Sequence, residues 1–171
     1  MNLDDLPPPE EMWAGKFVRA MRRGKWEYAS RANDIRAVVI LAEYEGKLVL
    51  IDQPRVPPNR NCLELPAGLV GDQDPDATIE GTAIKELEEE TGFTAEHVER
   101  LGDFYSSPGM LSEGFTLVRA TGLKKTGEGG GDENEDINVH LVPRADVRRF
   151  IDEKREQGFG IDVKLLLFMN W

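Results

Sequence analysis

The sequence predicts an α/β sandwich, in which the strands of a mixed sheet and a few helices surround a single core. Three observations indicate this class. The 171 residues are enough for one domain with a sizeable core and too few for two ordinary ones. Runs of β-branched residues alternate along the chain with segments of helical apolar spacing. Neither an internal repeat nor a domain boundary interrupts the chain after residue 34.

The first 34 residues are expected to form an extension that carries an antiparallel hairpin. The segment PPPE predicts extended chain, because proline is excluded from helix interiors. Residues 16–31, KFVRAMRRGKWEYASR, predict two short strands on either side of Arg23-Gly24. We therefore divide the chain into an N-terminal extension, residues 1–34, and a main domain, residues 35–171.

Most of the main domain has the pattern of strands. Residues 36–44 and 47–53 are rich in aliphatic and β-branched side chains, and the Glu-Gly pair between them is a turn signal. Two adjacent core strands are expected here. A proline-interrupted loop leads to a strand at residues 62–70, CLELPAGLV. Further strands are expected at residues 97–107, 114–125 and 137–144.

One helix is expected in the middle of the chain and two near its end. An acidic loop leads into the first helix, which is expected to end at Gly92 because glycine suits the left-handed cap position. Residues 145–158 and 161–171 carry apolar side chains at helical spacing and predict two amphipathic helices. Residues 127–136, GEGGGDENED, are too rich in glycine for an element and predict a flexible acidic loop.

Composition and charge argue against several classes of protein. The formal net charge of −11 argues against a nucleic-acid partner, since phosphate backbones are bound by basic surfaces. No apolar run approaches the ~18 residues that a membrane span requires. The opening residues lack the basic start and apolar middle of a secretory signal, and the single cysteine, Cys62, excludes an internal disulfide. A cytoplasmic protein that binds neither nucleic acid nor membrane is expected.

One short stretch is distinguished by its charge. In KELEEETGF, residues 85–93, Glu86, Glu89 and Glu90 lie at i, i+3 and i+4 and share one helix face. Their repulsion in open water is under about 1 kcal/mol per pair, so the pattern is tolerable without a ligand. Two interpretations remain open. The face is either solvated, or it binds Mg²⁺ or Mn²⁺, which prefer carboxylate oxygens; in the second case a carboxylate of the acidic loop could deprotonate a water.

The sequence lacks the common motifs for other metal or phosphate sites. An EF-hand loop requires Gly at position 6 and Glu at position 12, and neither acidic loop meets both requirements. The GEGGGD segment lacks the Gly-Lys-Ser/Thr ending of a P-loop. His97 and His140 belong to no HExxH motif, which argues against zinc.

The residues around the acidic helix resemble a known family. Residues 68–93, GLVGDQDPDATIEGTAIKELEEETGF, are similar to the Nudix box, which is Gly-x5-Glu-x7-Arg-Glu-U-x-Glu-Glu-x-Gly-U with U apolar. The second half of the box, from Glu86 to Phe93 in this chain, matches at every fixed position. Lys85 replaces the usual Arg. Lysine lacks the planar guanidinium fork of arginine. The first Glu of the box is absent whether the box begins at Gly68 or at Gly71. The resemblance places the metal ligands in the matching part, so these departures bear on efficiency more than on activity.

The resemblance extends over nearly the whole chain. KWEYASR, RAVVILAEYEGKLVLIDQPR, LELPAG, YSSPGMLSE and GGGDENEDINVHLVPR look like the ADP-ribose pyrophosphatase branch of the Nudix hydrolases. Pro108 lies at about the distance beyond the box that marks this branch. The resemblance implies the Nudix α/β/α sandwich with a mixed central sheet. It also implies hydrolysis of a diphosphate with Mg²⁺, or Mn²⁺ in its place, as the cofactor.

The resemblance further implies a set of metal-binding and catalytic residues. The expected metal ligands are Ala67, through its backbone carbonyl, Glu86, Glu89 and Glu90. Glu89 would bridge the ions or assist catalysis. Glu133 aligns with the general base of the branch, and Glu135 is the alternative or an additional metal ligand.

Substrate contacts and a dimer are also implied. Five side chains are expected to bind substrate: Phe17, Trp26, Arg31, Arg55 and Met110. Arg55 would contact the diphosphate, since a guanidinium can bind phosphate oxygens with two hydrogen bonds. Trp26 would reach from one subunit into the site of the other and, with Phe17, sandwich an adenine. A homodimer held partly by the N-terminal extension is therefore expected.

These implications together predict an enzyme that hydrolyses ADP-ribose, or a related ADP-sugar, to AMP and a sugar phosphate. Two alternatives remain open from the sequence. The first is the same chemistry on another nucleoside diphosphate sugar such as GDP-mannose. The second is a non-catalytic regulator with the same fold that binds nucleotide without cleaving it.

Overall fold

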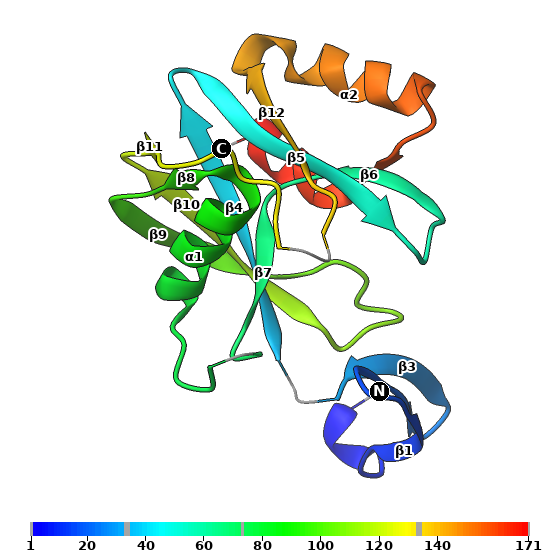
Figure 1. Cartoon of the computed structure of the whole chain (residues 1–171). Coiled ribbons are helices and arrows are strands. Elements are labelled where there is room, and N and C mark those ends of the chain that lie inside the picture. The colour runs from blue at the N-terminus through cyan, green and yellow to red at the C-terminus, as the bar shows by residue number, and fades with distance from the viewer. Residues whose placement is uncertain (1, 33–34, 73, 133–134, 171) are drawn as a thin grey trace.

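The predicted fold class, an α/β/α sandwich with a mixed central sheet, is confirmed. The computed structural model describes residues 2–32, 35–72, 74–132 and 135–170. A mixed sheet lies between two helices, α1 (Ile79–Thr91) and α2 (Val147–Glu156), as Figure 1 shows. A separate small sheet formed by the N-terminal residues lies at the bottom of the same view.

The central sheet has eight strands in the described part of the chain. The strands are β4 (Arg36–Tyr44), β5 (Lys47–Arg55), β6 (Arg60–Glu64), β7 (Ala67–Val70), β9 (His97–Tyr105), β10 (Gly114–Thr121), β12 (Asn138–Pro143) and β13 (Gly160–Ile161). Their order is β13-β6-β5-β4-β10-β9, with β12 also paired to β5 and β7 to β4. The pairs β10–β4 and β13–β6 are parallel, and the other pairs are antiparallel.

The two halves of this sheet are joined beside one turn. β4 pairs with β5 at Glu43–Leu48 and at Tyr44–Lys47. Beyond these two positions β4 continues beside β7 and β10, whereas β5 continues beside β6 and β12. The halves therefore diverge with distance from the turn, and residues of both line a cavity near the far ends of β4 and β5.

The core has two layers, one on each face of β4. Successive side chains of a strand point to opposite faces, and β4 is apolar on both. Val38, Ile40 and Ala42 pack with Ala83 and Leu87 of α1, and Val39 and Leu41 pack with Val147 and Ile151 of α2. All of these side chains are buried. Burial of each large aliphatic side chain contributes about 2 kcal/mol, which fixes the sheet between the helices.

Helix α1 is capped at both ends by its own sequence. The Thr78 side chain accepts a hydrogen bond from the Gly81 amide at 3.0 Å, which satisfies one of the free N–H groups of the first turn. At the other end Gly92 has a φ of 71° and its amide donates to the Glu88 carbonyl. The prediction that Gly92 ends the helix is confirmed, and the acidic face of the helix is held in a regular geometry up to its last turn.

The glycine-rich loop that begins at residue 127 is bonded to the C-terminal end of α1. The Gly130 amide donates to the Glu90 carbonyl at 2.9 Å, and the Gly131 amide donates to the Glu89 carbonyl at 3.0 Å. These carbonyls belong to the last turn, which has no intrahelical partners for them. A side chain at Gly129 would collide with the Thr91 backbone, so the close approach requires glycine there. This attachment was not expected from the sequence, which predicted a flexible loop.

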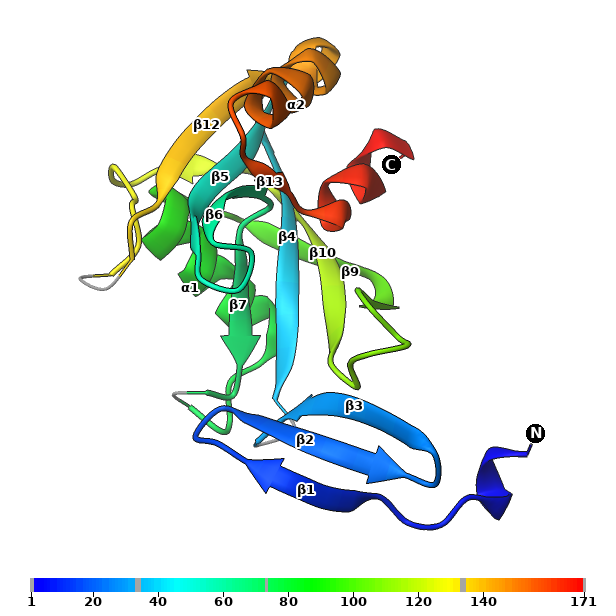
Figure 2. The same ribbon diagram turned by 90° about the vertical axis from the view of Figure 1, so that its right-hand side faces the viewer.

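The N-terminal residues form a three-stranded sheet. Its strands are β1 (Glu10–Ala14), β2 (Val18–Arg23) and β3 (Trp26–Arg31), preceded by a short 3-10 helix, η1 (Leu3–Asp5). The predicted hairpin is β2–β3, and β1 adds a strand that the sequence did not predict. Figure 2 shows this sheet apart from the central one. The two are linked at the backbone of Ala29, whose amide donates to the Met110 carbonyl at 2.9 Å and whose carbonyl accepts from the Ser112 amide at 3.0 Å.

Three other segments differ from the predicted elements. The strand expected at residues 114–125 ends at Thr121 and is followed by a separate short strand, Lys124–Lys125, which pairs with Phe93–Thr94. The strand expected at residues 62–70 is two strands, because Pro66 has no N–H for a ladder and its carbonyl accepts from the Ile40 amide at 2.8 Å. The C-terminal segment contains β13 and a 3-10 helix, η3 (Val163–Asn170), instead of an α-helix. The remaining short elements are η2 (Arg144–Asp146), β8 (Phe93–Thr94) and β11 (Lys124–Lys125). None of the helices in the described residues is long and apolar enough to cross a membrane.

Candidate active site

A cavity of about 820 Å³ lies where the two halves of the central sheet diverge. Ala37 and Val39 of β4 line one side, and Gln53 and Arg55 of β5 line the other. The same cavity is lined by the N-terminal end of β7, by the acidic face of α1 and by part of the acidic loop. Segments that are far apart in the sequence therefore meet in one place.

The acidic face of α1 lines this cavity, as its spacing suggested. Glu86, Glu89 and Glu90 are all lining residues. They differ in exposure: Glu90 is 3% exposed, Glu86 is half-buried, and Glu89 is exposed and pairs with Lys85, with the Nζ and Oε2 atoms 3.4 Å apart. The face is thus not simply solvated, because its last carboxylate is in the protein interior.

Burial controls the electrostatics of Glu90. It raises the pKa of this carboxyl from 4.5 to about 8, and the neighbouring charges of Glu86 and Glu135 add to the effect. The Ala67 amide, which donates to the Glu90 carboxylate at 3.0 Å, and the charge of Arg55 offset only part of it. Burial likewise raises the pKa of Glu86. A cation placed between these two carboxylates would remove their electrostatic penalty.

Gly68 makes room for Glu86. A Cβ atom at position 68 would overlap the Cγ, Cδ and Oε1 atoms of Glu86. The Pro-Ala-Gly turn therefore brings backbone directly against a carboxylate, a close approach that only glycine allows. Of the two glycines that could begin the box, Gly68 is the one that contacts the acidic helix; Gly71 has a φ of 89° and lines the cavity farther along.

The basic residues of the cavity are each paired with a carboxylate. Arg55 binds Glu64 through two hydrogen bonds of 2.8 and 2.7 Å. Arg31 of β3 pairs with Glu113, and Lys164 of η3 pairs with Asp162. Arg31, Arg55 and Lys164 all line the cavity. The cavity thus has an acidic side on α1 and a side where cations are matched by carboxylates.

The balance of charge in the cavity is strongly negative. Among the described residues, nine carboxylates and four cationic side chains line it. An anionic ligand would therefore be repelled unless a cation entered with it. No cluster of three metal-ligating side chains occurs among the described residues. The Glu86 and Glu90 carboxylates nevertheless suit Mg²⁺, which keeps several waters and commonly shares its site with substrate phosphates.

The structure brings together most of the residues that the sequence selected. The lining residues among them are Ala67, Glu86, Glu89, Glu90, Glu135, Arg31 and Arg55. Phe17, Trp26 and Met110 are exposed and do not line the cavity of a single chain. Glu133, the favoured general base, lies outside the described residues. Glu135 is exposed, and its carboxylate accepts a hydrogen bond from the Asp132 amide at 3.1 Å.

The lining residues that sequence reasoning missed include Glu64, Glu113, Asp132 and Lys164. Glu64 carried a signal, because a carboxylate within the apolar strand CLELP has to be paired if it is buried. Glu113 and Asp132 lie within the segments YSSPGMLSE and GGGDENEDINVHLVPR, which resemble the family, but neither residue was given a role of its own. Lys164 carried no local signal, since only the fold brings the C-terminal segment to this cavity.

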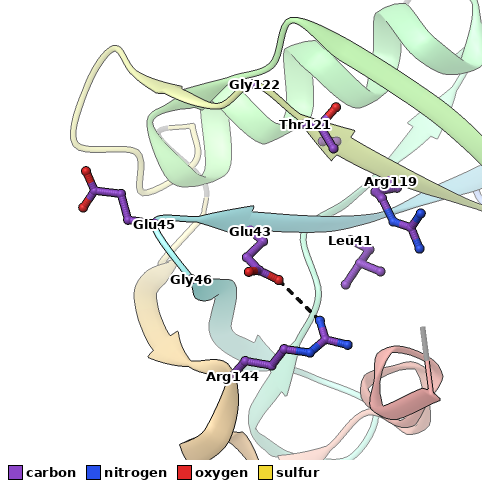
Figure 3. Close-up of a pocket in the computed structure, with 9 residues that line it drawn as sticks. Leu41, Glu43, Glu45, Gly46, Arg119, Thr121, Gly122 and Arg144 are labelled. Atoms are coloured by element: carbon purple, nitrogen blue, oxygen red, sulfur yellow. Dashed lines mark hydrogen bonds and ion pairs between the residues drawn. The ribbon is translucent and has the colours of Figure 1, made fainter.

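A second, smaller cavity of about 390 Å³ lies beside the β4–β5 turn. Its walls include Glu43, Arg119 and Arg144, and Glu43 pairs with Arg144 at 3.3 Å (Figure 3). It contains none of the residues that the sequence selected. We take the larger cavity as the candidate active site, because the perturbed carboxylates and the arginines converge there.

Comparison with known families agrees with this assignment. The model of the NUDIX domain matches residues 32–160. The chain belongs to the Nudix family. The matched region contains the central sheet up to β13, helices α1 and α2 and the acidic loop, so the candidate active site lies almost entirely within the Nudix domain.

Similar curated proteins have several names. The ADP-ribose pyrophosphatase of Bacillus subtilis is 36% identical over 154 residues, which are 85% of this chain and 81% of that protein. The GDP-mannose pyrophosphatase of Cronobacter sakazakii is 35% identical over 157 residues, 86% of this chain and 77% of that protein. The methanol dehydrogenase activator of Bacillus methanolicus is 39% identical over 119 residues, 68% of this chain but only 62% of that protein.

A solved structure described as an ADP compounds hydrolase has the same fold. The TM-score is 0.66 at 24% sequence identity, and the match covers 84% of this chain and 82% of the other. The Nudix fold of this chain, with its N-terminal addition, is thereby established.

Proposed function

We propose that this Nudix protein is a diphosphatase that hydrolyses a nucleoside diphosphate sugar, with ADP-ribose or a related ADP-sugar as the first candidate. The observation that supports it most is the pair of half-buried Glu86 and buried Glu90, one helical turn apart in a cavity that Arg55 also lines. Two similar proteins, from Bacillus subtilis and Cronobacter sakazakii, are named as pyrophosphatases of this substrate class.

We further propose that the acidic side holds a divalent cation. Glu86, Glu90 and the carbonyl of Ala67 are the proposed ligands, with Glu89 at the exposed edge. The two carboxylates suit Mg²⁺, or Mn²⁺ in its place, since both prefer oxygen ligands. When bound, the cation would supply charge neutralisation for the diphosphate and Lewis acidity toward water.

The remaining roles are assigned to the chain's own side chains. Arg55 and Arg31 would bind and orient the anionic substrate. A carboxylate of the acidic loop would accept a proton from the attacking water, and Glu133 and Glu135 are the two candidates. Replacing each by Gln separates them: the general base is the residue whose loss lowers turnover by more than about tenfold.

The N-terminal sheet suggests a homodimer. Phe17 and Trp26 are 65% and 48% exposed, and Trp13 and Met110 are exposed nearby in the same part of the molecule. Such apolar groups usually mark a binding surface. We propose that residues 1–34 contact a second copy and that Phe17 and Trp26 complete its cavity. Light scattering should give a dimer, and Trp26→Ala should raise KM more than it lowers kcat; an active monomer would refute this.

The central experiment is a substrate panel. ADP-ribose, other ADP-sugars and GDP-mannose would each be incubated with Mg²⁺, with Mn²⁺ and with EDTA, and the products separated by chromatography. The expected result is AMP and ribose 5-phosphate from ADP-ribose in the presence of metal, and no product with EDTA. Faster cleavage of GDP-mannose would reassign the substrate, and no cleavage of any compound would overturn the proposed function.

A regulatory function is the second candidate. It is favoured by the similarity to a protein named as a methanol dehydrogenase activator and by the missing first Glu of the box. The same panel decides between the two candidates. A regulator would bind a nucleotide by calorimetry yet release no product with Mg²⁺ or Mn²⁺ present.

A further inference from the structure

The Glu64 carboxylate has no role in the site as proposed so far. It projects from β6 between Leu63 and Leu65, which are both fully buried, and is itself 5% exposed. It also lines the cavity of the candidate active site. A buried carboxylate is costly unless its oxygens are satisfied, so its surroundings indicate what it is for.

Both oxygens of Glu64 are bonded to one guanidinium. The Nε atom of Arg55 donates to Oε1 at 2.8 Å, and Nη2 donates to Oε2 at 2.7 Å. A guanidinium has five N–H donors, and this pair occupies two of them along one edge. The other three make no hydrogen bond to any residue that the structure describes. They are available to a ligand in the cavity that Arg55 lines.

The two partners of this ion pair differ in exposure. The Glu64 side chain is 7% exposed, whereas that of Arg55 is 44% exposed. A pair that served only packing would bury both groups; here the carboxylate is inside and the guanidinium faces the cavity. The hydrogen bond to Glu64 also raises the pKa of Arg55, so the guanidinium remains charged.

Arg55 has other carboxylates within electrostatic reach, and Glu90 is one of them. Without Glu64, the freely rotating guanidinium would be attracted to the acidic face of α1. There it would neutralise the carboxylates that are proposed to bind the cation. The bidentate pair prevents this, because it fixes both the position and the plane of the guanidinium.

We infer that Glu64 is a positioning residue, which holds the Arg55 guanidinium with its free edge toward the diphosphate and away from Glu86 and Glu90. This inference rests on the proposed function for the identity of the ligand. It predicts two separable effects of losing Glu64: weaker binding of the diphosphate through Arg55, and weaker binding of the divalent cation.

The first test observes the guanidinium directly. The Nε–H group of Arg55 should give a distinct resonance in a ¹⁵N–¹H spectrum, identified by its absence in Arg55→Lys. In Glu64→Gln this resonance should shift or disappear through exchange with water. The matched control is Glu43→Gln, which removes a carboxylate from the Glu43–Arg144 pair of the other cavity (Figure 3) and should leave the Arg55 resonance in place.

The second test measures function and cation binding. In Glu64→Gln, kcat/KM should fall by about tenfold to a hundredfold, the range for a misplaced binding group. Glu64→Asp, which keeps the charge on a shorter side chain, should recover part of the loss. In an Arg55→Ala background, Glu64→Gln should change kcat/KM by less than about twofold, because the group that it positions is absent. Mn²⁺ affinity, measured by calorimetry without substrate, should fall in Glu64→Gln and remain unchanged in Glu43→Gln.

The outcomes distinguish this inference from the proposed function. If the wild-type protein cleaves no diphosphate, the proposed function fails, and the Arg55 resonance and the Mn²⁺ titration still decide the role of Glu64. An unchanged resonance together with unchanged Mn²⁺ affinity in Glu64→Gln would overturn the inference. If Glu64→Gln does not fold, Arg55→Lys replaces it: this variant keeps the charge, loses the two-point bond, and should show the same loss of kcat/KM. Full activity of Arg55→Lys would overturn the inference as well.

Discussion

Two carboxylates in this protein are almost equally buried and have opposite electrostatic properties. Asp52 on β5 is 2% exposed and Glu90 on α1 is 3% exposed. Asp52 accepts from Asn138 Nδ2 at 3.1 Å and from Lys154 Nζ at 2.8 Å, and His140 Nε2 lies 2.5 Å away. Burial raises the pKa of Asp52, but the hydrogen bonds from Lys154, His140 and Asn138 outweigh it and hold the pKa below 3.8. The pKa of Glu90 instead rises to about 8.

The difference lies in the partners. Asp52 has a side-chain cation and two further polar partners, so its charge is compensated within the fold and it joins β5, β12 and α2. Glu90 receives one backbone hydrogen bond, from Ala67, and faces further carboxylates. A buried charge that the fold leaves uncompensated is the kind of group that binds a cation or takes part in chemistry. Two carboxyl groups of nearly equal exposure therefore differ in role: Asp52 is bonded within the fold, and Glu90 is the one that we propose to be functional.

The largest expected effect comes from Glu90→Gln. This change keeps the shape of the side chain and removes the charge that we propose binds the cation. We expect kcat/KM to fall by about a hundredfold to a thousandfold, as for loss of a preorganised electrostatic group. The melting temperature of the metal-free protein should change little near neutral pH, because burial already disfavours the charged form of this carboxyl and Gln has nearly the same shape. Glu88→Gln, on an exposed position of the same helix, is the control and should remain within twofold of the wild type. If Glu90→Gln retained more than a tenth of the activity, the proposal that Glu90 is functional and Asp52 is structural would be contradicted.

Asp52→Asn should show the reverse pattern. It leaves the Lys154 ammonium, whose side chain is mostly buried, without its charged partner. The free energy of unfolding should fall by about 3 kcal/mol, as for one partner removed from a buried pair, while cation binding at α1 is unchanged. Urea denaturation measures the first quantity and calorimetry the second. In Asp103→Asn, where an exposed carboxylate loses Arg100 and Thr116 as partners, the change should be much smaller than in Asp52→Asn.

Gly68→Ala tests the acidic side through its backbone. The new methyl group would displace the flexible Glu86 side chain from its place beside the Pro-Ala-Gly turn. We expect kcat/KM to fall by about tenfold, with little change in the free energy of unfolding, since a side chain and not a backbone segment has to move. Gly109→Ala is the control, because a Cβ there meets no atom within 4 Å. Equal activities of the two variants would show that the position of Glu86 is unimportant.

The smallest effect is a dependence of stability on pH. The pKa of Asp52 is lower in the folded protein than its ordinary value of 3.8, so the folded state binds fewer protons than the unfolded state in acid. The contribution of Asp52 is therefore complete above about pH 4 and is lost as the pH falls through the folded value. The difference in unfolding free energy between the wild type and Asp52→Asn should shrink accordingly. A difference that stays constant down to pH 2 would show that folding does not lower the pKa of Asp52.

The sequence predicted those features that depend on local pattern. The strands predicted at residues 36–44 and 47–53 follow from continuous aliphatic runs, although the second continues to Arg55 in the structure, and the end of α1 follows from Gly92. The spacing of Glu86, Glu89 and Glu90 predicted that the three share one helix face, and it left open whether that face is solvated or binds a cation. The family was recognised from the same residues and is confirmed.

Other features depend on long-range pairing and could not be predicted. Strand β1, EEMWA, shows no alternation of polar and apolar residues, and it forms because it pairs with β2. The partners of Asp52 are 86 or more residues away in the sequence, so no local pattern connects them. The Glu64–Arg55 pair joins β5 and β6; the sequence selected Arg55 as a substrate contact but not Glu64 as its partner. Glu90 is buried and Glu89 is exposed because β7 lies beside Glu90. The helical spacing of the two residues does not indicate where β7 lies.

The last turn of α1 carries out two tasks with the same two residues. Through their side chains Glu89 and Glu90 face the cavity, and through their carbonyls they hold the Gly130–Gly131 segment that leads to Glu135. The acidic loop is thus attached beside the proposed cation ligands by two backbone hydrogen bonds to the residues that carry them. An insertion between residues 89 and 92 is therefore expected to displace the start of this loop and the proposed cation ligands together.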